Sequence, residues 1–551
     1  MSKELNIKIN DTYMDDEKKS EHVVEYKTCV GDILKAECGS TYTKILGVII
    51  NNQLRTLDYK LVEDSIIEPV YYSSLDGYKI YCRTVKFLLY MALKRCYPNL
   101  HPTICNTIED TIYFMCKKES FTNEMADTLL SEMKKIVSNN SPITKRYVSY
   151  EEAVDLYKAY SQEADEIELK LRSTLPFYFC EDLFANMHGV LAPYTSCINL
   201  FDIKPFRKGF ALICPKKDNE NSIKAEPEEN IIYSVFEENE EYLDSIGIKN
   251  VSDLNSSIIN GNFAQIIQIN EAMQNNKLAD IVSQIKQRET IKMIFVAGPS
   301  SSGKTTFSKK LGLNLRLLGY NPIVISMDNY FKDRKDTPKL PNGEYDFETI
   351  DAMDLSLFNE HMLRLIKGEK VETPRFDFIK GKKTYEGDYI QLNKKDVLII
   401  EGIHALNPVV SRIINDELKY KIYIAPMTAL NINNFSKIST TDTRMIRRIV
   451  RDSRTRGYTA EETLSMWSNL MKGETNYIYP YIKHADYIYN TSLAYEMAVI
   501  KLSAMPALLK VSPESDVYSE ARRLYGVLNN FLPQDSKHVP ADSLLREFIG
   551  K

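Results

Sequence analysis

A glycine-bounded loop with the spacing G-x-x-x-x-G-K-[ST] constrains the fold of this chain more than any other segment. The loop reads Gly298-Pro299-Ser300-Ser301-Ser302-Gly303-Lys304-Thr305-Thr306. The apolar run at 293–297 predicts a strand before it, and apolar residues at helical spacing between Phe307 and Leu318 predict a helix after it. In that context the backbone N–H groups of the loop and the helix N-terminus attract a polyphosphate. The segment therefore predicts a nucleoside triphosphate site.

Two side chains of the loop have predicted roles of their own. Lys304 is expected to reach the β- and γ-phosphates, and the Thr305 hydroxyl is expected to hold Mg²⁺. The alternative is a Gly/Ser turn that contains a lysine by chance. That alternative leaves the flanking strand and helix unexplained.

Length, charge and cysteine content exclude several classes of protein. A chain of 551 residues predicts three or four domains, and its net charge of −5 provides no overall basic field for nucleic acid. The apolar stretches fall short of the ~20 residues that span a bilayer, and the first residues lack the apolar core of a secretory signal. The nine cysteines lie between Cys29 and Cys214 without a C-x-x-C pair, which favours reduced thiols over disulfides or a zinc site. We expect a cytoplasmic protein with no membrane partner.

Changes in composition and periodicity divide the chain into six expected segments. They are a flexible tail (1–20), a β-rich domain (21–80), an α+β domain (81–214), a linker and helical connector (215–288), an α/β domain (289–510) and a C-terminal helical extension (511–551). Helices are expected near 85–97, 122–137 and 262–287. Strand-like and helix-like segments alternate from about 290 to 500, which predicts a parallel sheet with helices on both faces.

Two further apolar runs in this α/β domain end in an acid. Residues 323–327 lead to Asp328, and residues 397–400 lead to Glu401. Ligands bind at the carboxyl ends of the strands in an open parallel sheet, so both acids are expected beside the phosphate loop. We interpret Asp328 as the base that accepts the proton of an attacking hydroxyl, and Glu401 as the acid on the metal side. A capping or solvated role is the alternative for each.

An arginine-rich helix is the third feature of the α/β domain. Six arginines fall within thirteen residues, with only Asp452 among them to offset their charge: Arg444, Arg447, Arg448, Arg451, Arg454 and Arg456. Such a group repels itself unless an anion joins it, which a lid closing over triphosphate would supply. We expect Arg448 and Arg451 to contact ATP. A solvated helix face or a nucleic-acid patch is the alternative.

Residues from about 290 to 500 resemble the uridine kinase and phosphoribulokinase family of P-loop kinases. The matching segments are residues 298–306, Asp328-Asn329-Tyr330-Phe331, Tyr345-Asp346-Phe347-Glu348 with Asp351-Ala352, Pro374-Arg375-Phe376-Asp377-Phe378, Glu401-Gly402-Ile403, and Thr441-Asp442-Thr443-Arg444 with Arg447-Arg448 and Arg451-Asp452. The resemblance implies ATP and Mg²⁺ as cofactors and Asp328 as the catalytic aspartate. It also implies that Glu348 lies near the nucleoside, and that Arg444 and Arg447 of the lid bind substrate and phosphate.

The sequence departs from that family where the base is read. Uridine–cytidine kinases carry Tyr and, five residues later, His at the positions of Phe376 and Gly381. Phe376 can stack on a base but has no hydroxyl, and Gly381 has no side chain. Each lost polar group weakens discrimination between substrates. Phosphoryl transfer itself does not depend on these two positions.

The N-terminal half resembles other modules. Residues 21–80 resemble a TGS domain, the β-grasp module of threonyl-tRNA synthetase. Residues 81–214 resemble the editing domain of that enzyme through Arg83-Thr84-Val85-Lys86-Phe87-Leu88, Tyr97-Pro98, Thr107-Ile108-Glu109-Asp110 and Phe121-Thr122. Arg83 and Phe87 stand at the positions of the editing H-x-x-x-H, and neither binds metal as histidine does, so we expect binding or regulation rather than hydrolysis. The whole arrangement resembles long uridine-kinase-like proteins that fuse these modules.

These features lead to one main expectation and two alternatives. We expect an α/β P-loop kinase, preceded by α+β domains, that phosphorylates a small-molecule nucleoside such as uridine or cytidine in pyrimidine salvage. One alternative is a kinase of another sugar alcohol, as in phosphoribulokinase. The other is an RNA- or ribosome-associated NTP-dependent regulator, in which the TGS-like region would contact nucleic acid. A homo-oligomer is compatible with all three.

Overall fold

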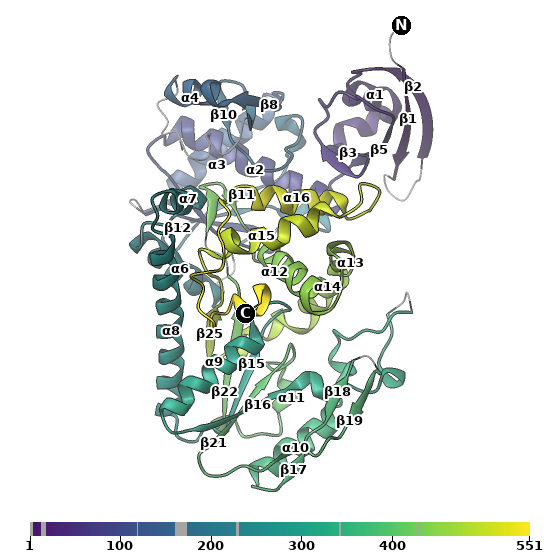
Figure 1. Cartoon of the computed structure of the whole chain (residues 1–551). Helices are drawn as coiled ribbons and strands as arrows, with labels where there is room; N and C mark the ends of the chain where they lie inside the picture. The colour runs from purple at the N-terminus through teal and green to yellow at the C-terminus, as the bar shows by residue number, and fades with distance from the viewer. Residues whose placement is uncertain are drawn as a thin grey trace. The chain divides into compact units, whose positions relative to one another are not determined.

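The computed structural model describes residues 4–12, 18–117, 120–159, 174–227, 231–340, 343–378, 380–427 and 430–550. Its contacts divide the chain into two compact units, each discontinuous in sequence (Figure 1). The N-terminal unit comprises Met1–Ile259, Ala429–Ile438 and Leu509–Leu532. The P-loop unit comprises Asn260–Thr428, Ser439–Leu508 and Pro533–Lys551.

The P-loop unit is built on a five-stranded sheet in which every neighbouring pair of strands is parallel. In spatial order the strands are β16 (Asn321–Ser326), β21 (Asp396–Glu401), β15 (Met293–Ala297), β22 (Lys419–Ala425) and β25 (Tyr487–Asn490). All residues of β15 and β21 are buried, as expected for central strands of a parallel sheet. The prediction of a parallel α/β sheet is confirmed.

Helices α8 (Phe263–Gln287) and α9 (Lys304–Leu317) pack on one face of this sheet (Figure 1). Their apolar residues, among them Ile281 and Leu311, form a buried cluster with alternate residues of the strands. On the opposite face Phe295 is also fully buried, so the sheet is covered on both sides. The helix predicted at 262–287 corresponds to α8.

The described residues of the N-terminal unit form three sheets of three or more strands. Its main elements are β1 (Glu4–Asp11), β2 (Lys18–Glu25), α1 (Val30–Cys38), β3 (Gly47–Ile50), β4 (Gln53–Arg55), β5 (Ser65–Val70), α2 (Leu75–Cys96), β6 (Thr103–Ile108), β7 (Thr111–Met115), α3 (Asn123–Ser138), β8 (Thr144–Ser149), α4 (Tyr150–Ala159), β9 (Thr174–Cys180), β10 (Leu183–Ala185), β11 (Asp202–Phe206) and β12 (Gly209–Ile213). The sheets have the strand orders β2-β1-β5-β3-β4, β11-β12-β7-β6 and β10-β9-β8. Helix α1 packs in the core of the first sheet, and α2 and α3 both contribute buried residues to a second, larger core.

The expected flexible tail is wrong for much of residues 1–20. Strands β1 and β2 pair along their whole length, and β1 also pairs in parallel with β5. In β1 every second residue is buried, because Leu5, Ile7 and Ile9 alternate with polar residues on the solvent face. Because the polar residues of this alternation lie in a charged stretch of sequence, the strand was not predicted. Residues 1–3 and 13–17 lie outside the described residues.

The boundaries of the two units differ from the predicted continuous domains. The segment Ala429–Ile438 interrupts the P-loop unit in sequence but folds with the N-terminal unit. It forms a hairpin of β23 (Asn431–Asn433) and β24 (Ser436–Lys437), and Asn431 Nδ2 donates to the carbonyl of Ile104 at 3.0 Å. The ring of Phe435 at its turn packs edge-on against Tyr90.

The predicted linker at 215–288 is largely structured. It contains the hairpin β13 (Pro215–Lys216) and β14 (Asn219–Ile223), followed by α6 (Ile232–Ser245) and α7 (Val251–Ile259) in the N-terminal unit and then α8. In the described part of the predicted helical extension, residues 511–550, the helices are α16 (Tyr518–Leu528) and α17 (Arg546–Ile549). No helix among the described residues is both long and apolar enough to cross a bilayer.

Candidate functional site

The phosphate-loop motif lies between the central strand β15 and the start of α9, as predicted. Two of its glycines are required by the backbone. A Cβ on Gly298 would lie 2.2 Å from the carbonyl oxygen of Ile424, and Gly303 has φ +93°, in the left-handed region. The loop therefore turns tightly around backbone N–H groups at the helix N-terminus, which is the arrangement that binds phosphate.

Lys304 begins α9 and stays close to its own loop. Its Nζ donates to the carbonyl oxygens of Gly298 at 2.9 Å and Pro299 at 3.1 Å. Burial lowers the pKa of Lys304, while nearby Glu401 and Asp328 oppose that shift. The neighbouring Thr305 is exposed.

The two predicted acids converge on this lysine. Glu401 is the last residue of β21, and it lies in register with Ser326, which ends β16 two residues before Asp328. Burial raises the pKa of Glu401, and the charge of Asp328 raises it further. The pKa of Asp328 is also raised by the protein packed around it, although the side chain keeps contact with solvent. Both acids therefore lie at the carboxyl end of the sheet with Lys304.

Two further acids lie together, Glu348 and Glu474 of α14 (Trp467–Tyr477). Burial raises the pKa of Glu348 to about 7, with a further contribution from the charge of Glu474. Gly473 makes this approach possible, because a Cβ there would lie 2.4 Å from the Cβ of Glu348. The site thus contains a carboxyl group that titrates near neutral pH.

The arginine-rich segment is α12 (Thr440–Thr455), capped by the side chain of Ser439. Arg444 is fully buried and forms an ion pair with Glu474. Its Nε donates to the carbonyl of Ser300 at 2.9 Å, and the Ser300 N–H donates to Glu474 at 3.1 Å. These contacts join the arginine helix, α14 and the phosphate loop in one network.

Arg447 is likewise fully buried and paired. It contacts Glu496, the first residue of α15 (Glu496–Leu509), and donates to the carbonyl of Thr491 at 2.9 Å. The prediction that only a bound anion could offset the arginine charge is therefore wrong. Glu474 and Glu496 supply carboxylates from sequence positions 30 and 49 residues away.

Arg448 and Arg451 are the arginines whose surroundings best fit the predicted contact with phosphate. Arg448 Nη1 donates to the hydroxyl of Ser300 at 2.8 Å. The buried carboxylate of Asp452 contacts Arg448 at 3.2 Å, Arg451 at 2.9 Å and Arg456 at 3.5 Å. Arg451 Nη2 is buried with no hydrogen-bond partner among the described residues. An incoming anion could accept from it without displacing a protein contact.

Phe376 and Gly381 lie in a small hairpin of β18 (Arg375–Asp377) and β19 (Lys382–Thr384). The ring of Phe376 is buried against Phe331, with ring centroids 5.8 Å apart. Gly381 has φ +64°, and a Cβ there would lie 2.7 Å from Nε of Arg334. The place of the side chain that Gly381 lacks is thus filled by Arg334, which no sequence pattern singles out.

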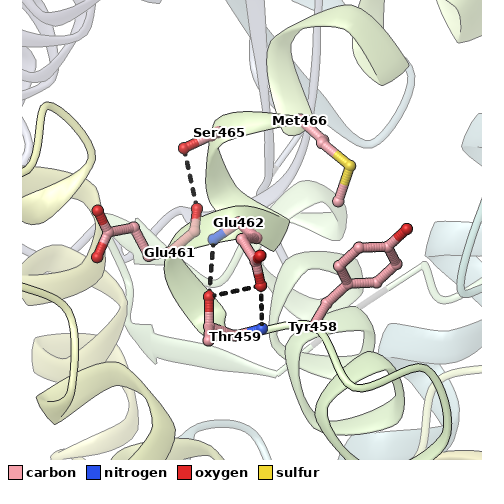
Figure 2. A pocket seen from close by; sticks show the side chains of 6 residues that line it. All are labelled: Tyr458, Thr459, Glu461, Glu462, Ser465 and Met466. Atoms are coloured by element: carbon pink, nitrogen blue, oxygen red, sulfur yellow. Dashed lines mark hydrogen bonds between the residues drawn. The ribbon is translucent and has the colours of Figure 1, made fainter.

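A pocket of about 480 Å³ lies elsewhere in the P-loop unit, beside α13 (Ala460–Ser465). Figure 2 shows its lining residues, Tyr458, Thr459, Glu461, Glu462, Ser465 and Met466. Its main polar groups bind each other in a capping box, in which the Glu462 N–H donates to Thr459 and the Thr459 N–H donates to Glu462. None of the residues predicted for catalysis lines this pocket.

We predict that Glu474→Ala strongly destabilises the P-loop unit. The change leaves Arg444 buried without its carboxylate, which costs about 3–5 kcal/mol of unfolding free energy. Denaturant unfolding followed by Trp467, the single tryptophan, measures this locally, because the Arg444 guanidinium lies 5.3 Å from its ring. Glu360→Ala is the control, since its pair with Arg364 is exposed and should contribute less than about 1 kcal/mol. Equal effects of the two variants would contradict the analysis.

We also predict that Glu348 makes the stability of this unit depend on pH. Because its pKa is raised from 4.5 to about 7, the folded protein retains a proton that the unfolded chain releases at lower pH. The contribution of Glu348 to unfolding free energy therefore falls as pH rises from about 4.5 to 7. Thermal unfolding should show wild type losing stability relative to Glu348→Gln across this range. Parallel melting-temperature curves would show that the carboxyl group is not perturbed.

Comparisons with known proteins agree with this site. The Phosphoribulokinase / Uridine kinase family profile matches residues 293–495. The uridine kinase of Staphylococcus haemolyticus is 31% identical over 197 residues, which are 36% of this chain and 86% of that protein. The uridine kinase of Staphylococcus epidermidis is 30% identical over the same shares of both chains. The solved D-glycerate 3-kinase of Cryptococcus neoformans shares 14% identity over 37% of this chain and 87% of its own, with a TM-score of 0.28.

The family profile spans the described phosphate loop, acids and arginine helix, and the match to the uridine kinase of Staphylococcus haemolyticus covers 86% of that protein. Through its P-loop unit, this chain belongs to the phosphoribulokinase/uridine kinase family of kinases.

Proposed function

We propose that this protein transfers the γ-phosphoryl group of ATP to the 5′-hydroxyl of a nucleoside, uridine or cytidine, and so serves pyrimidine salvage. The observation that carries the proposal is the convergence of Lys304, Asp328 and Glu401 at the carboxyl end of one parallel sheet. A phosphate-binding loop alone would suit any NTP-binding protein. An acid beside that loop adds a group that can take the proton of an acceptor hydroxyl, as phosphoryl transfer requires.

Asp328 is the proposed general base. The protein packed around it raises the pKa of Asp328, which makes the carboxylate a stronger base for the proton of the attacking hydroxyl. Lys304 would exchange its contacts with the loop carbonyls for the β- and γ-phosphates of ATP. The nucleophile and the phosphate would thus be held from the ends of β16 and β15, which lie on either side of β21.

The residues present fit Mg²⁺. The exposed Thr305 hydroxyl and the Glu401 carboxylate offer hard oxygen donors, and the pKa of Glu401, raised by burial and by Asp328, marks a site where a cation relieves repulsion. When bound, Mg²⁺ would neutralise charge on the transferred phosphoryl group.

The arginines of α12 divide into two proposed roles. Arg448 and Arg451 would contact the phosphates, since both are partly accessible and Arg451 Nη2 is unpaired among the described residues. Arg444 and Arg447, assigned to substrate by resemblance, are fully buried in carboxylate pairs. We propose that these two position the loop and α15, and that they act on substrate through those contacts.

The acceptor would lie near Glu348 and the aromatic hairpin around Phe376. Relatives named uridine kinase favour a pyrimidine nucleoside over another sugar alcohol as the acceptor. The sugar-alcohol alternative stays open, because Phe376 and Gly381 lack the polar groups of uridine–cytidine kinases. Arg334, beside Gly381, is a polar group that could replace them.

The N-terminal unit is proposed to bind a ligand or partner without hydrolysing it. Its first sheet, with parallel β1 and β5 and helix α1 in its core, supports a TGS-like β-grasp module. Phe87, at one editing position, is fully buried, and Arg83 occupies the other. A regulator that contacts nucleic acid through this unit remains the second candidate.

Asp328→Asn tests the proposed chemistry. The amide cannot accept the hydroxyl proton, so turnover should fall by roughly 10²–10⁴-fold while ATP binding persists. Asp336→Asn, an exposed acid eight positions later, should leave turnover unchanged. Lys304→Ala should abolish transfer by removing a charge-assisted phosphate contact. If Asp328→Asn changed only the Michaelis constant and left turnover unaffected, Asp328 would be a binding residue and not the base.

Weak base selectivity is a further prediction. If the base is held by stacking on the hairpin, kcat/KM for uridine and cytidine should agree within ~10-fold. One hydrogen bond contributes only about 0.5–1.5 kcal/mol of net free energy. Steady-state kinetics with both nucleosides measures this. A thousandfold difference between the two kcat/KM values would show that another group reads the base. Arg334 would then be the first residue to substitute.

A further inference from the structure

The end of the chain folds onto the phosphate loop within the P-loop unit. Glu547 of α17 accepts two hydrogen bonds from Thr306, one from the backbone N–H at 3.2 Å and one from the hydroxyl at 2.8 Å. Both bonds go to the same carboxylate oxygen, Oε2. Thr306 is the last residue of the motif and the third residue of α9. An acidic side chain therefore occupies donors in the first turn of the helix that would face ATP.

The segment that carries Glu547 is firmly anchored. Arg454 of α12 donates to the carbonyl of Phe548 at 3.1 Å and to that of Glu547 at 2.9 Å. The guanidinium of Arg447 lies 4.9 Å from the ring of Phe548, which is fully buried. The carboxylate is thus held at the loop by the same helix whose Arg448 and Arg451 we propose contact the phosphates.

The charge of Glu547 also reaches the phosphate-binding lysine. It stabilises the charged form of Lys304 together with Glu401 and Asp328. Backbone N–H groups of such a loop cradle the α- and β-phosphates. A carboxylate on Thr306 would compete with a phosphate oxygen for these donors and would repel the phosphate at the same time.

We propose that Glu547 is an intrasteric competitor of the nucleotide, which must leave Thr306 before the triphosphate can seat fully. The proposal rests on the proposed function, because it assumes that the loop binds ATP. Nucleotide binding then releases Glu547 from Thr306, so the mobility of α17 depends on whether the loop holds nucleotide. The contacts of Arg454 transmit this change to α12. A purely structural cap would lack this antagonism with nucleotide.

The test compares the affinity of the full chain for a non-hydrolysable ATP analogue with Mg²⁺ by calorimetry. Glu547→Ala and Glu547→Gln should bind about tenfold more tightly than wild type, because neither presents a competing charge. Asp542→Ala is the matched control: it removes an acid from the same segment, where Asp542 pairs with Lys310 at 3.4 Å, and should change affinity less than twofold. Glu547→Gln preserves the shape of the side chain and guards against an effect of misfolding.

A second measurement follows the release of α17 directly. Amide hydrogens of residues 546–550 in wild type should exchange faster when the analogue is bound. Unchanged or weaker binding by both Glu547 variants, while wild type binds the analogue, would overturn the competitor but leave the kinase assignment intact. Absence of binding by every variant and by wild type would overturn both.

Discussion

The buried ion pair of Arg444 and Glu474 ties the candidate site together. Two opposite charges removed from water are stable only when each is well satisfied, and here both also bind the phosphate loop. Arg444 donates to the carbonyl of Ser300, and the N–H of Ser300 donates to Glu474. Any movement of the arginine helix is therefore transmitted to the loop that follows β15. The carboxylate of Glu474 also lies beside Glu348, whose pKa is raised by burial and further by the charge of Glu474.

The parallel sheet explains why acids and lysine meet at one place. Strands β16, β21 and β15 are adjacent and run in the same direction, so the residues that follow them emerge at one edge. The protein packed around that edge makes negative charge costly, although Asp328 keeps contact with solvent, and it raises the pKa values of Asp328 and Glu401. Such a cluster of carboxylates favours the binding of a cation, which phosphoryl transfer needs.

The parts of this site that follow from local patterns could be predicted from sequence. Phosphate loop, strand and helix are consecutive, and Asp328 and Glu401 each end an apolar run. The partners of the arginines could not be predicted, because Glu474 and Glu496 are distant in sequence and belong to no local motif. Strand β1 was missed because its buried face alternates with charged residues. The hairpin at 431–437 was missed because it belongs to a different unit from its sequence neighbours. Contacts between distant segments decide these features, whereas periodicity reports only local structure.

Transfer of label from ATP tests the central claim most directly. The full chain is incubated with Mg²⁺, ATP labelled in the γ-phosphate and a panel of acceptors: uridine, cytidine, purine nucleosides, ribulose 5-phosphate and glycerate. Our account predicts label in uridine and cytidine 5′-monophosphates, and none with the Asp328→Asn variant on the same time scale. Label appearing only in a sugar phosphate or only as inorganic phosphate would contradict it.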